Sequence, residues 1–277
     1  MKRIGQILLG ILVVLVLLVG GVLGWAYYDM NTGGSEALTN TAIEGDGVTL
    51  NAYLAEPSGE GPHPAVIMIH EWWGLREGIT QKADALAEQG YVVLAVDAFR
   101  GQQASSVPGA LVLNLSYDQA LIDADMDAYL DFLTGRDDVD ASRVGIMGYC
   151  FGGRQATMAA VRQPAAFAAV LNYYGGSTPN TVEALDPLRG QDVMVLGVFG
   201  EEDTSIPLEE VDTFEASLQE LDIEHEITVY EGVGHAFVTE DSINETDTAA
   251  AQAWQQGVTF LDTHLTADAE SDTDTTS

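Results

Sequence analysis

The sequence predicts an α/β domain, with a mostly parallel central sheet and helices on both faces, preceded by one N-terminal transmembrane helix. Three observations predict it. Short apolar runs alternate with amphipathic segments along the body of the chain. A long apolar stretch without charges opens the chain. A glycine-rich turn that contains the only cysteine follows directly after one of the apolar runs.

The apolar stretch at the N-terminus, residues 4–28, contains no charged residue. A helix of this length rises about 37 Å and can cross a hydrocarbon core of about 30 Å. Lys2 and Arg3 precede it, so the positive-inside rule predicts a cytoplasmic N-terminus. We therefore expect residues 1–28 to be a single-pass anchor in the cell membrane, with the catalytic domain outside the cytoplasm. The alternative is a signal peptide that is cleaved to leave a secreted protein, because Gly24-Trp25-Ala26 is a small-x-small sequence.

The rest of the chain predicts one folded domain between two polar segments. Residues 29–38 are rich in Gly, Ser, Thr and Asn, which is typical of a flexible linker. Residues 266–277 are mostly Asp, Glu, Thr and Ser, which is typical of a disordered acidic tail. Residues 39–265 then form a single α/β domain of ordinary size.

The charge of the chain is strongly negative, with 43 acidic against 10 basic residues and a net charge of −33. Such self-repulsion is best tolerated where salt screens it, so we expect a halophilic source, and an acidic protein of a low-salt organism is the alternative. The same balance argues against nucleic acid as a partner, since phosphates are bound by clustered Lys and Arg.

The domain opens with an alternating run, residues 48–54, that predicts an edge strand. The later apolar runs are nearly continuous, as in strands that are buried on both faces of a parallel sheet. These runs are residues 65–69, 91–96, 144–147, 167–171 and 193–199. Helices are predicted at residues 79–89, 117–133, 152–162, 208–221 and 246–265. Ligands of such sheets bind beyond the carboxyl ends of the strands.

The turn Gly148-Tyr149-Cys150-Phe151-Gly152-Gly153 stands between the run 144–147 and a predicted helix. This is the G-x-S-x-G nucleophile elbow of α/β-hydrolases with Cys in place of Ser. The helix N-terminus beside Cys150 would favour a thiolate. A structural buried cysteine is the alternative, but the elbow favours a nucleophile. With one cysteine, no disulfide can form within the chain.

A thiol nucleophile requires a base and an orienting acid, which in α/β-hydrolases follow it along the chain. Of the downstream histidines, His235 lies in a glycine-rich loop after a strand, whereas His225 begins that strand and His264 ends the last helix. We therefore expect His235 to be the base. For the acid, the loop after the run 193–199 offers Glu201, Glu202 and Asp203, and the pattern alone does not separate them.

Three motifs in the order His70-Glu71-Trp72-Trp73-Gly74, the cysteine elbow and Gly234-His235-Ala236-Phe237 resemble the dienelactone hydrolase family. The resemblance covers about residues 47–265. It implies Asp203 as the acid, because the family's acid precedes a hydrophobic-Pro pair, here Ile206-Pro207. It also implies that Glu71 contacts the cysteine and takes part in its activation.

By analogy with other α/β-hydrolases, the backbone N–H groups of Trp72 and Phe151 would form the oxyanion hole. Arg100 matches an arginine that binds the substrate carboxylate in the family, and a guanidinium fork suits that group. The family's companion arginine is replaced by Thr239. Half of the family's anion clamp is therefore missing, so the resemblance implies the reaction class and leaves the ester or lactone substrate unassigned.

The sequence thus predicts a cysteine hydrolase that cleaves a small-molecule ester or lactone through an acyl-enzyme. A general carboxylesterase or acetylesterase on the same fold is one alternative, and a catalytically inactive surface binding protein is another. No cofactor is implied, and no metal, because no His, Cys and carboxylate group has ligand spacing. The expected partners are the substrate and the membrane.

Overall fold

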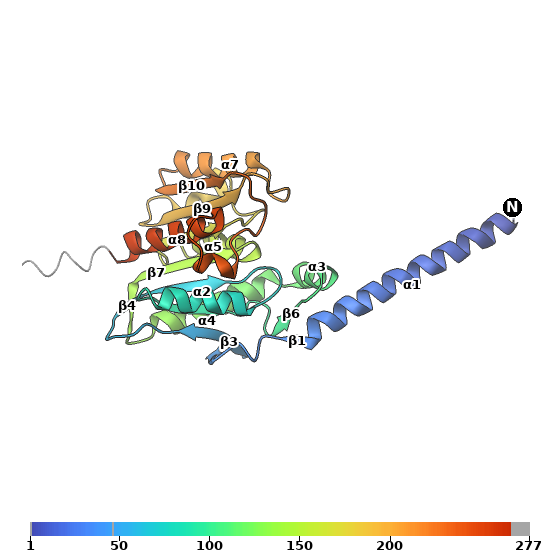
Figure 1. Cartoon of the computed structure of the whole chain (residues 1–277), viewed down its shortest axis with the longest axis horizontal. Coiled ribbons are helices and arrows are strands. Elements are labelled where there is room, and N and C mark those ends of the chain that lie inside the picture. The colour runs from blue at the N-terminus through green and yellow to red at the C-terminus, as the bar shows by residue number, and fades with distance from the viewer. Residues whose placement is uncertain (1, 46, 267–277) are drawn as a thin grey trace, which may run out of the picture.

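The computed structural model describes residues 2–45 and 47–266, and in this part of the chain eight strands form one sheet (Figure 1). The order across the sheet is β10-β9-β8-β7-β4-β5-β3-β2. All neighbours from β10 to β5 are parallel, whereas β3 and β2 add antiparallel pairs at one edge. The strands are β2 (Thr41–Glu44), β3 (Thr49–Ala55), β4 (His63–Ile69), β5 (Val92–Val96), β7 (Val139–Tyr149), β8 (Ala169–Tyr173), β9 (Met194–Gly200) and β10 (His225–Tyr230).

The centre of the sheet is buried on both faces, as the continuous apolar runs predict. Every residue of β5 is buried, as is every residue of β4 after His63. Such strands require helices over both sides. The fold class is therefore confirmed as a mostly parallel sheet with helices on both faces.

The helices follow the strands in alternation. The helices of the body are α2 (Glu77–Ala87), α3 (Val107–Ser116), α4 (Gln119–Thr134), α5 (Phe151–Arg162), α6 (Val182–Leu185), η1 (Asp186–Leu188), α7 (Leu208–Glu220), η2 (Glu240–Ile243) and α8 (Ala249–Leu265). Helices α4 and α5 are neighbours, because Arg162 of α5 pairs with Asp127 of α4 at 2.5 Å. Helices α2 and α8 are linked through η2, which both of them contact.

Two local expectations differ from the structure. The run 48–54 forms β3, but β2 pairs with it and takes the edge position, so β3 is not the edge strand. The helix expected from residue 117 begins at Gln119, and a separate helix, α3, precedes it. Ser106 caps α3 by accepting from Gly109 N–H at 3.2 Å, and Pro108 lies in its first turn. An apolar helix of this kind lacks the polar face by which amphipathic helices are recognised.

The N-terminal helix α1 (Lys2–Thr32) extends away from the body (Figure 1). Its segment Leu8–Thr32 has a mean hydropathy of 2.8 over its most apolar window and is long enough to cross a membrane. A membrane span and a signal sequence both fit this length and composition.

The segment 29–38, expected as a flexible linker, is instead attached to the body. Helix α1 continues to Thr32, and β1 (Gly33–Gly34) pairs antiparallel with β6 (Gln102–Gln103). Asp29 is buried as a hydrogen-bond acceptor, with its carboxylate facing Ser105 and Ser106. The expected acidic tail, from residue 267 onward, lies outside the described residues.

Candidate active site

The turn between β7 and α5 is as tight as the glycine pattern requires. Cys150 has φ 54° and ψ −113°, a conformation that side chains rarely adopt and that costs about 1–3 kcal/mol. A Cβ on Gly148 would lie 2.2 Å from the carbonyl carbon of Gly152, and a Cβ on Gly152 would lie 2.3 Å from the carbonyl oxygen of Ile69. Only glycine fits at either position, so the elbow fixes where the thiol points.

The Cys150 thiol is half-buried, and its pKa is raised to about 12. Burial is the largest cause, and the negative charge of Glu71 adds to it. Two hydrogen bonds act in the opposite direction, from the backbone N–H groups of Phe151 and Trp72. The free protein therefore holds a neutral thiol at which two backbone donors converge.

His235 lies in the loop after β10, and its Nδ1 is 2.6 Å from Oδ2 of Asp203. The Asp203 carboxylate is fixed from behind, because its Oδ1 accepts from the backbone N–H groups of Ser205 at 2.7 Å and Ile206 at 3.2 Å. With Nδ1–H donated to Asp203, the other ring nitrogen is left free as a base. This arrangement orients an imidazole in the way that proton transfer requires.

The two other carboxylates of the loop after β9 do not contact His235. Glu201 is exposed and accepts from the backbone N–H of Gly232 at 3.1 Å, and Glu202 is also exposed. The geometry therefore brings Asp203 alone to His235, out of the three residues that the pattern left open.

Cys150 and His235 line one cavity of about 340 Å³. It lies at the carboxyl ends of the strands, between the elbow, the loop after β4 and helix α3. The remaining lining residues are Trp72, Asn114, Phe151, Arg154, Gly176, Ser177, Ser205 and Ile206.

Arg154 supplies the positive charge of this cavity. It lies one turn into α5, and its Nη1 donates to the hydroxyl of Tyr117 at 3.5 Å, a long hydrogen bond. Its Nε is buried without a hydrogen-bond partner among the described residues. A buried guanidinium donor of this kind favours an anionic or strongly polar acceptor in the cavity.

A second cavity of about 420 Å³ is lined by Glu71, Lys82 and Thr239 among others. Lys82 is buried, with its ammonium 4.7 Å from the ring centroid of Tyr149, the residue before the cysteine. Burial lowers the pKa of Lys82 and raises the pKa of Glu71, and the two charges oppose these shifts in each other. The charge of Glu71 therefore acts on both a buried cation and the thiol.

His70 holds the loop that carries Glu71 and Trp72. Its ring is fully buried, with Nε2 accepting from Ala98 N–H at 3.1 Å and Nδ1 2.6 Å from the carbonyl oxygen of Glu71. Because Nε2 accepts, the proton must lie on Nδ1, which donates to that carbonyl. The imidazole thus ties the loop after β4 to the loop after β5.

The structure does not bring Arg100 into the cavity of Cys150. Its guanidinium makes two hydrogen bonds of 2.7 Å to the buried carboxylate of Asp125, and it lines a different cavity of about 230 Å³. A bidentate pair of this kind occupies the fork that a substrate carboxylate would need.

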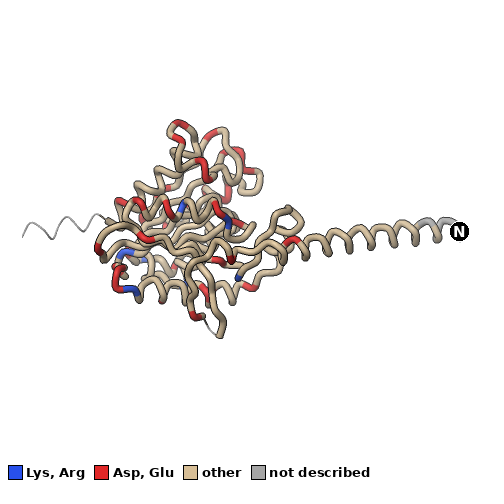
Figure 2. The backbone as a smooth tube through the Cα atoms, turned by 60° about the horizontal axis from the view of Figure 1, so that its bottom comes forward, with Lys and Arg blue, Asp and Glu red and all other residues tan. Residues whose placement is uncertain are grey.

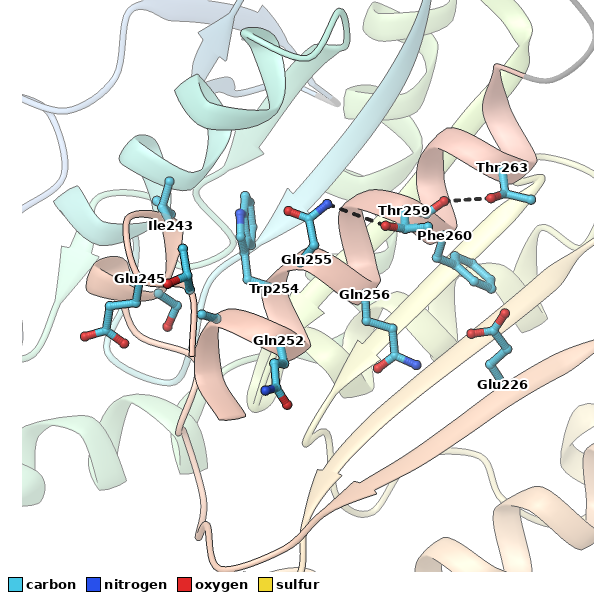
Figure 3. A pocket seen from close by; sticks show the side chains of 13 residues that line it. Glu226, Ile243, Glu245, Gln252, Trp254, Gln255, Gln256, Thr259, Phe260 and Thr263 are labelled. Atoms are coloured by element: carbon cyan, nitrogen blue, oxygen red, sulfur yellow. Dashed lines mark hydrogen bonds between the residues drawn. The ribbon is translucent and has the colours of Figure 1, made fainter. Parts of the chain in front are cut away.

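A larger cavity, of about 490 Å³, lies along α8 near η2 (Figure 3). Its labelled side chains are mainly amide, hydroxyl and apolar groups, with Glu226 and Glu245 at its sides. The lining holds neither a cysteine nor a histidine, so this cavity lacks the two groups that meet in the smaller cavity of Cys150 and His235. No cluster of three His, Cys, Asp or Glu residues with metal-binding geometry occurs in residues 2–45 and 47–266.

Sequence reasoning missed Lys82 and Arg154. Lys82 is the only lysine of the folded body, which is a signal, but its burial depends on how α2 packs on the sheet. Arg154 directly follows the two glycines of the elbow, so its position one turn from the cysteine was available from the sequence.

A strand, a strained turn and a helix at the carboxyl edge of this sheet define the protein as an α/β-hydrolase. More narrowly, the chain belongs to the dienelactone hydrolase family, whose model matches residues 50–265. It is therefore an ester or lactone hydrolase that acts on a small molecule.

Individual relatives agree with this assignment. The chain is 31% identical over 238 residues to a Yersinia pestis protein named "Putative carboxymethylenebutenolidase", with 81% of this chain and 87% of the relative covered. It is 30% identical over 231 residues to Protein usf of Aquifex pyrophilus, with 81% and 97% covered. The crystal structure of dienelactone hydrolase from Anabaena variabilis has a TM-score of 0.58 at 19% identity, covering 81% of this chain and 96% of that one, which shows the shared fold.

Proposed function

We propose that Cys150 is the nucleophile of this hydrolase and that the reaction passes through an acyl-enzyme. The observation that carries the proposal is the convergence of three functions on one cavity. A cysteine with a fixed direction, two backbone donors at its sulfur and a histidine oriented by Asp203 all meet there. These are the parts that covalent acyl transfer requires.

In the first half-reaction the Cys150 sulfur attacks the ester carbonyl, and the oxyanion accepts hydrogen bonds from the N–H groups of Trp72 and Phe151. His235 takes the thiol proton and gives it to the leaving alkoxide as the C–O bond breaks. In the second half-reaction His235 takes a proton from water, hydroxide forms the new C–O bond, and the proton returns to the sulfur as the C–S bond breaks. Asp203 holds the imidazolium throughout.

Burial, together with the charge of Glu71, keeps the thiol neutral while the site is empty. A neutral thiol resists oxidation, which suits an exported protein with one cysteine. We propose that substrate binding moves the carboxylate of Glu71 away from the sulfur and so permits ionisation. The buried cation at Lys82 supplies a position that a displaced carboxylate can occupy.

For substrate recognition, we propose that Arg154 binds a carboxylate or another anionic group of the ester. The role expected of Arg100 would require its pair with Asp125 to break, and Thr239 supplies no second cation. A carboxylesterase or acetylesterase preference differs from this only in the acyl and alcohol groups accepted. An inactive binding protein remains the alternative class.

The test is hydrolysis of p-nitrophenyl acetate by the full chain in high salt, with and without iodoacetamide. The proposal expects turnover that alkylation abolishes and that Cys150→Ala lowers by more than about 10⁴-fold. Turnover that is insensitive to both changes would exclude the cysteine mechanism, and no turnover of any activated ester would favour the binding protein.

We further propose that α1 anchors the domain outside the cytoplasm and that the acidic surface reflects a halophilic source. Lys2 and Arg3 before the apolar segment support the orientation. Acidic residues are spread over the body in Figure 2, as a salt-screened surface would have them. Loss of the folded state on dialysis to low salt, reversed by added salt, is the expected result.

A further inference from the structure

Helix α3 presents an apolar face to solvent. Val107, Leu111 and Leu115 are 59%, 47% and 75% exposed, and their spacing of four residues places them along one side of the helix. The surrounding segment from Gly101 to Tyr117 contains no charged residue, in a chain with 43 acidic ones. An uncharged face of this kind on so acidic a surface indicates an apolar partner.

The position of α3 identifies that partner. The helix packs against α1, at the end of α1 that meets the body (Figure 1). The carboxylate of Asp29, near the end of α1, accepts from the backbone N–H groups of Ser105 and Ser106 at 3.1 and 3.0 Å. These bonds hold the start of α3 beside the last turn of the apolar helix.

Aromatic side chains mark the level of a membrane surface at the same place. Trp25, Tyr27 and Tyr28 are 58%, 66% and 61% exposed on α1. Trp and Tyr are enriched at the boundary between hydrocarbon and water, because their rings are apolar and their N–H and O–H groups are polar. Asp29 follows directly, so α3 begins at the depth of this aromatic belt.

The catalytic cavity opens beside the same helix. Asn114 of α3 lines the cavity together with Cys150 and Trp72. Leu111 and Leu115 flank Asn114 along the helix. A partner that covers the exposed face of α3 therefore also lies close to the cavity.

We infer that α3 lies in the interface of the lipid bilayer and that the substrates are esters with an apolar chain, which enter the cavity from the membrane. The inference rests on the proposed function and on α1 remaining attached. An enzyme of this kind differs from a soluble lactone hydrolase in the route by which substrate enters the cavity and in the class of substrate. The occupant of the α3 face is lipid, and a second copy of the chain is the competing outcome of the test.

A depth measurement tests the contact without catalysis. Leu115→Cys is introduced in the full chain with Cys150→Ser, labelled with a nitroxide and placed in phosphatidylcholine nanodiscs. Leu208→Cys is the control, since Leu208 is 42% exposed on α7, far from α1 in Figure 1. The label at 115 is expected to be relaxed more by oxygen than by a water-soluble nickel chelate, and the label at 208 more by the chelate.

Equal exposure of both labels to the nickel chelate would overturn the inference. So would dipolar broadening at 115 that disappears on dilution with unlabelled protein, because it would show that a second copy covers the face.

A kinetic comparison tests the substrate class. In Leu111→Asn/Leu115→Asn, hydrolysis of bilayer-dissolved p-nitrophenyl laurate is expected to fall by about tenfold, because the cavity mouth loses its position at the lipid. Hydrolysis of soluble p-nitrophenyl acetate should stay within about twofold, as should both reactions in Leu208→Asn. An unchanged laurate rate would overturn the route. Failure of the native chain on both esters would instead refute the proposed function and leave the depth result to decide the membrane contact.

Discussion

Two couples of a carboxylate and a basic group surround Cys150, but they are built differently. Asp203 and His235 are joined by a 2.6 Å hydrogen bond, and His235 lines the cavity of Cys150. Glu71 and Lys82 line the other cavity and stabilise each other's charges without a salt bridge within 4.0 Å among the described residues. The first, hydrogen-bonded couple has the geometry of a proton-transfer pair, whereas the second, the charge couple, affects the thiol through the charge of Glu71.

This difference assigns separate tasks. A hydrogen-bonded imidazole has a fixed proton and a free lone pair, which is what turnover needs. A buried carboxylate near a thiol raises the pKa of the thiol and so controls when it ionises. Changes in the hydrogen-bonded couple should therefore lower the rate of turnover, and changes in the charge couple should alter the reactivity of the resting thiol.

Among changes to the groups around Cys150, the largest effect is expected from Asp203→Asn. The substitution keeps the shape but loses the charge that orients and stabilises the imidazolium, so kcat should fall by about 10³- to 10⁴-fold. The matched control is Glu202→Gln in the same loop, which is exposed and should stay within about twofold. Steady-state hydrolysis of p-nitrophenyl acetate measures both. Comparable losses in the two variants would show that the loop, and not the 2.6 Å pair, carries the effect.

The resting thiol should react slowly. With the pKa of Cys150 raised to about 12, the neutral form dominates at pH 8 and ionisation increases as the pH rises. Alkylation by iodoacetamide should therefore accelerate about tenfold per pH unit between pH 7 and 10, and at pH 8 be about 10²-fold slower than that of a free thiol. Mass spectrometry of the modified protein gives the rate. A plateau between pH 8 and 9 would contradict a raised pKa.

The charge couple of Glu71 and Lys82 is tested by the same alkylation assay. Glu71→Gln removes a charge that raises the thiol pKa, so alkylation at pH 8 should quicken by about three- to tenfold. Lys82→Met should act in the same direction, because loss of the ammonium raises the pKa of Glu71 and so favours its neutral form. The double variant should be no faster than Glu71→Gln, since the lysine acts through the carboxylate.

Thermal unfolding of each variant gives the control for that experiment. Lys82→Arg keeps the charge and should retain slow alkylation if it folds. Additive effects of the two single changes would show that Lys82 acts on the thiol independently of Glu71.

Residues of the site that have a local sequence motif were predictable, and residues whose role depends on packing were not. The elbow, His235 and the fold class were predictable because glycines at strand ends and continuous apolar runs are local signals. Asp203 required the family resemblance, since three carboxylates share its loop and only packing brings one to the histidine. Lys82 has no local motif, because its role arises where α2 crosses behind Tyr149.

In the N-terminal region, sequence composition gave the wrong expectation because a long-range contact decides the structure. Its polar composition predicts a linker, yet the carboxylate of Asp29 finds donors in Ser105 and Ser106, more than seventy residues away along the chain. Composition reports how a segment is solvated on its own, and does not report a partner that is distant in sequence. The same long-range dependence explains why α3 was not predicted as part of the cavity.

A further expected effect separates Arg154, which lines the cavity of Cys150, from Arg100, which lines a different cavity. Arg154 has a buried Nε without a partner among the described residues, whereas Arg100 is held by Asp125. In Arg154→Met, KM for a p-nitrophenyl ester that carries a carboxylate should rise about tenfold, and KM for neutral p-nitrophenyl acetate should change little. In Arg100→Met, both KM values should stay within about twofold, while the stability falls by about 1–2 kcal/mol because the buried Asp125 loses its partner. A carboxylate-specific rise in KM for Arg100→Met would restore the substrate role expected from the sequence, and it would require the Arg100–Asp125 pair to open when substrate binds.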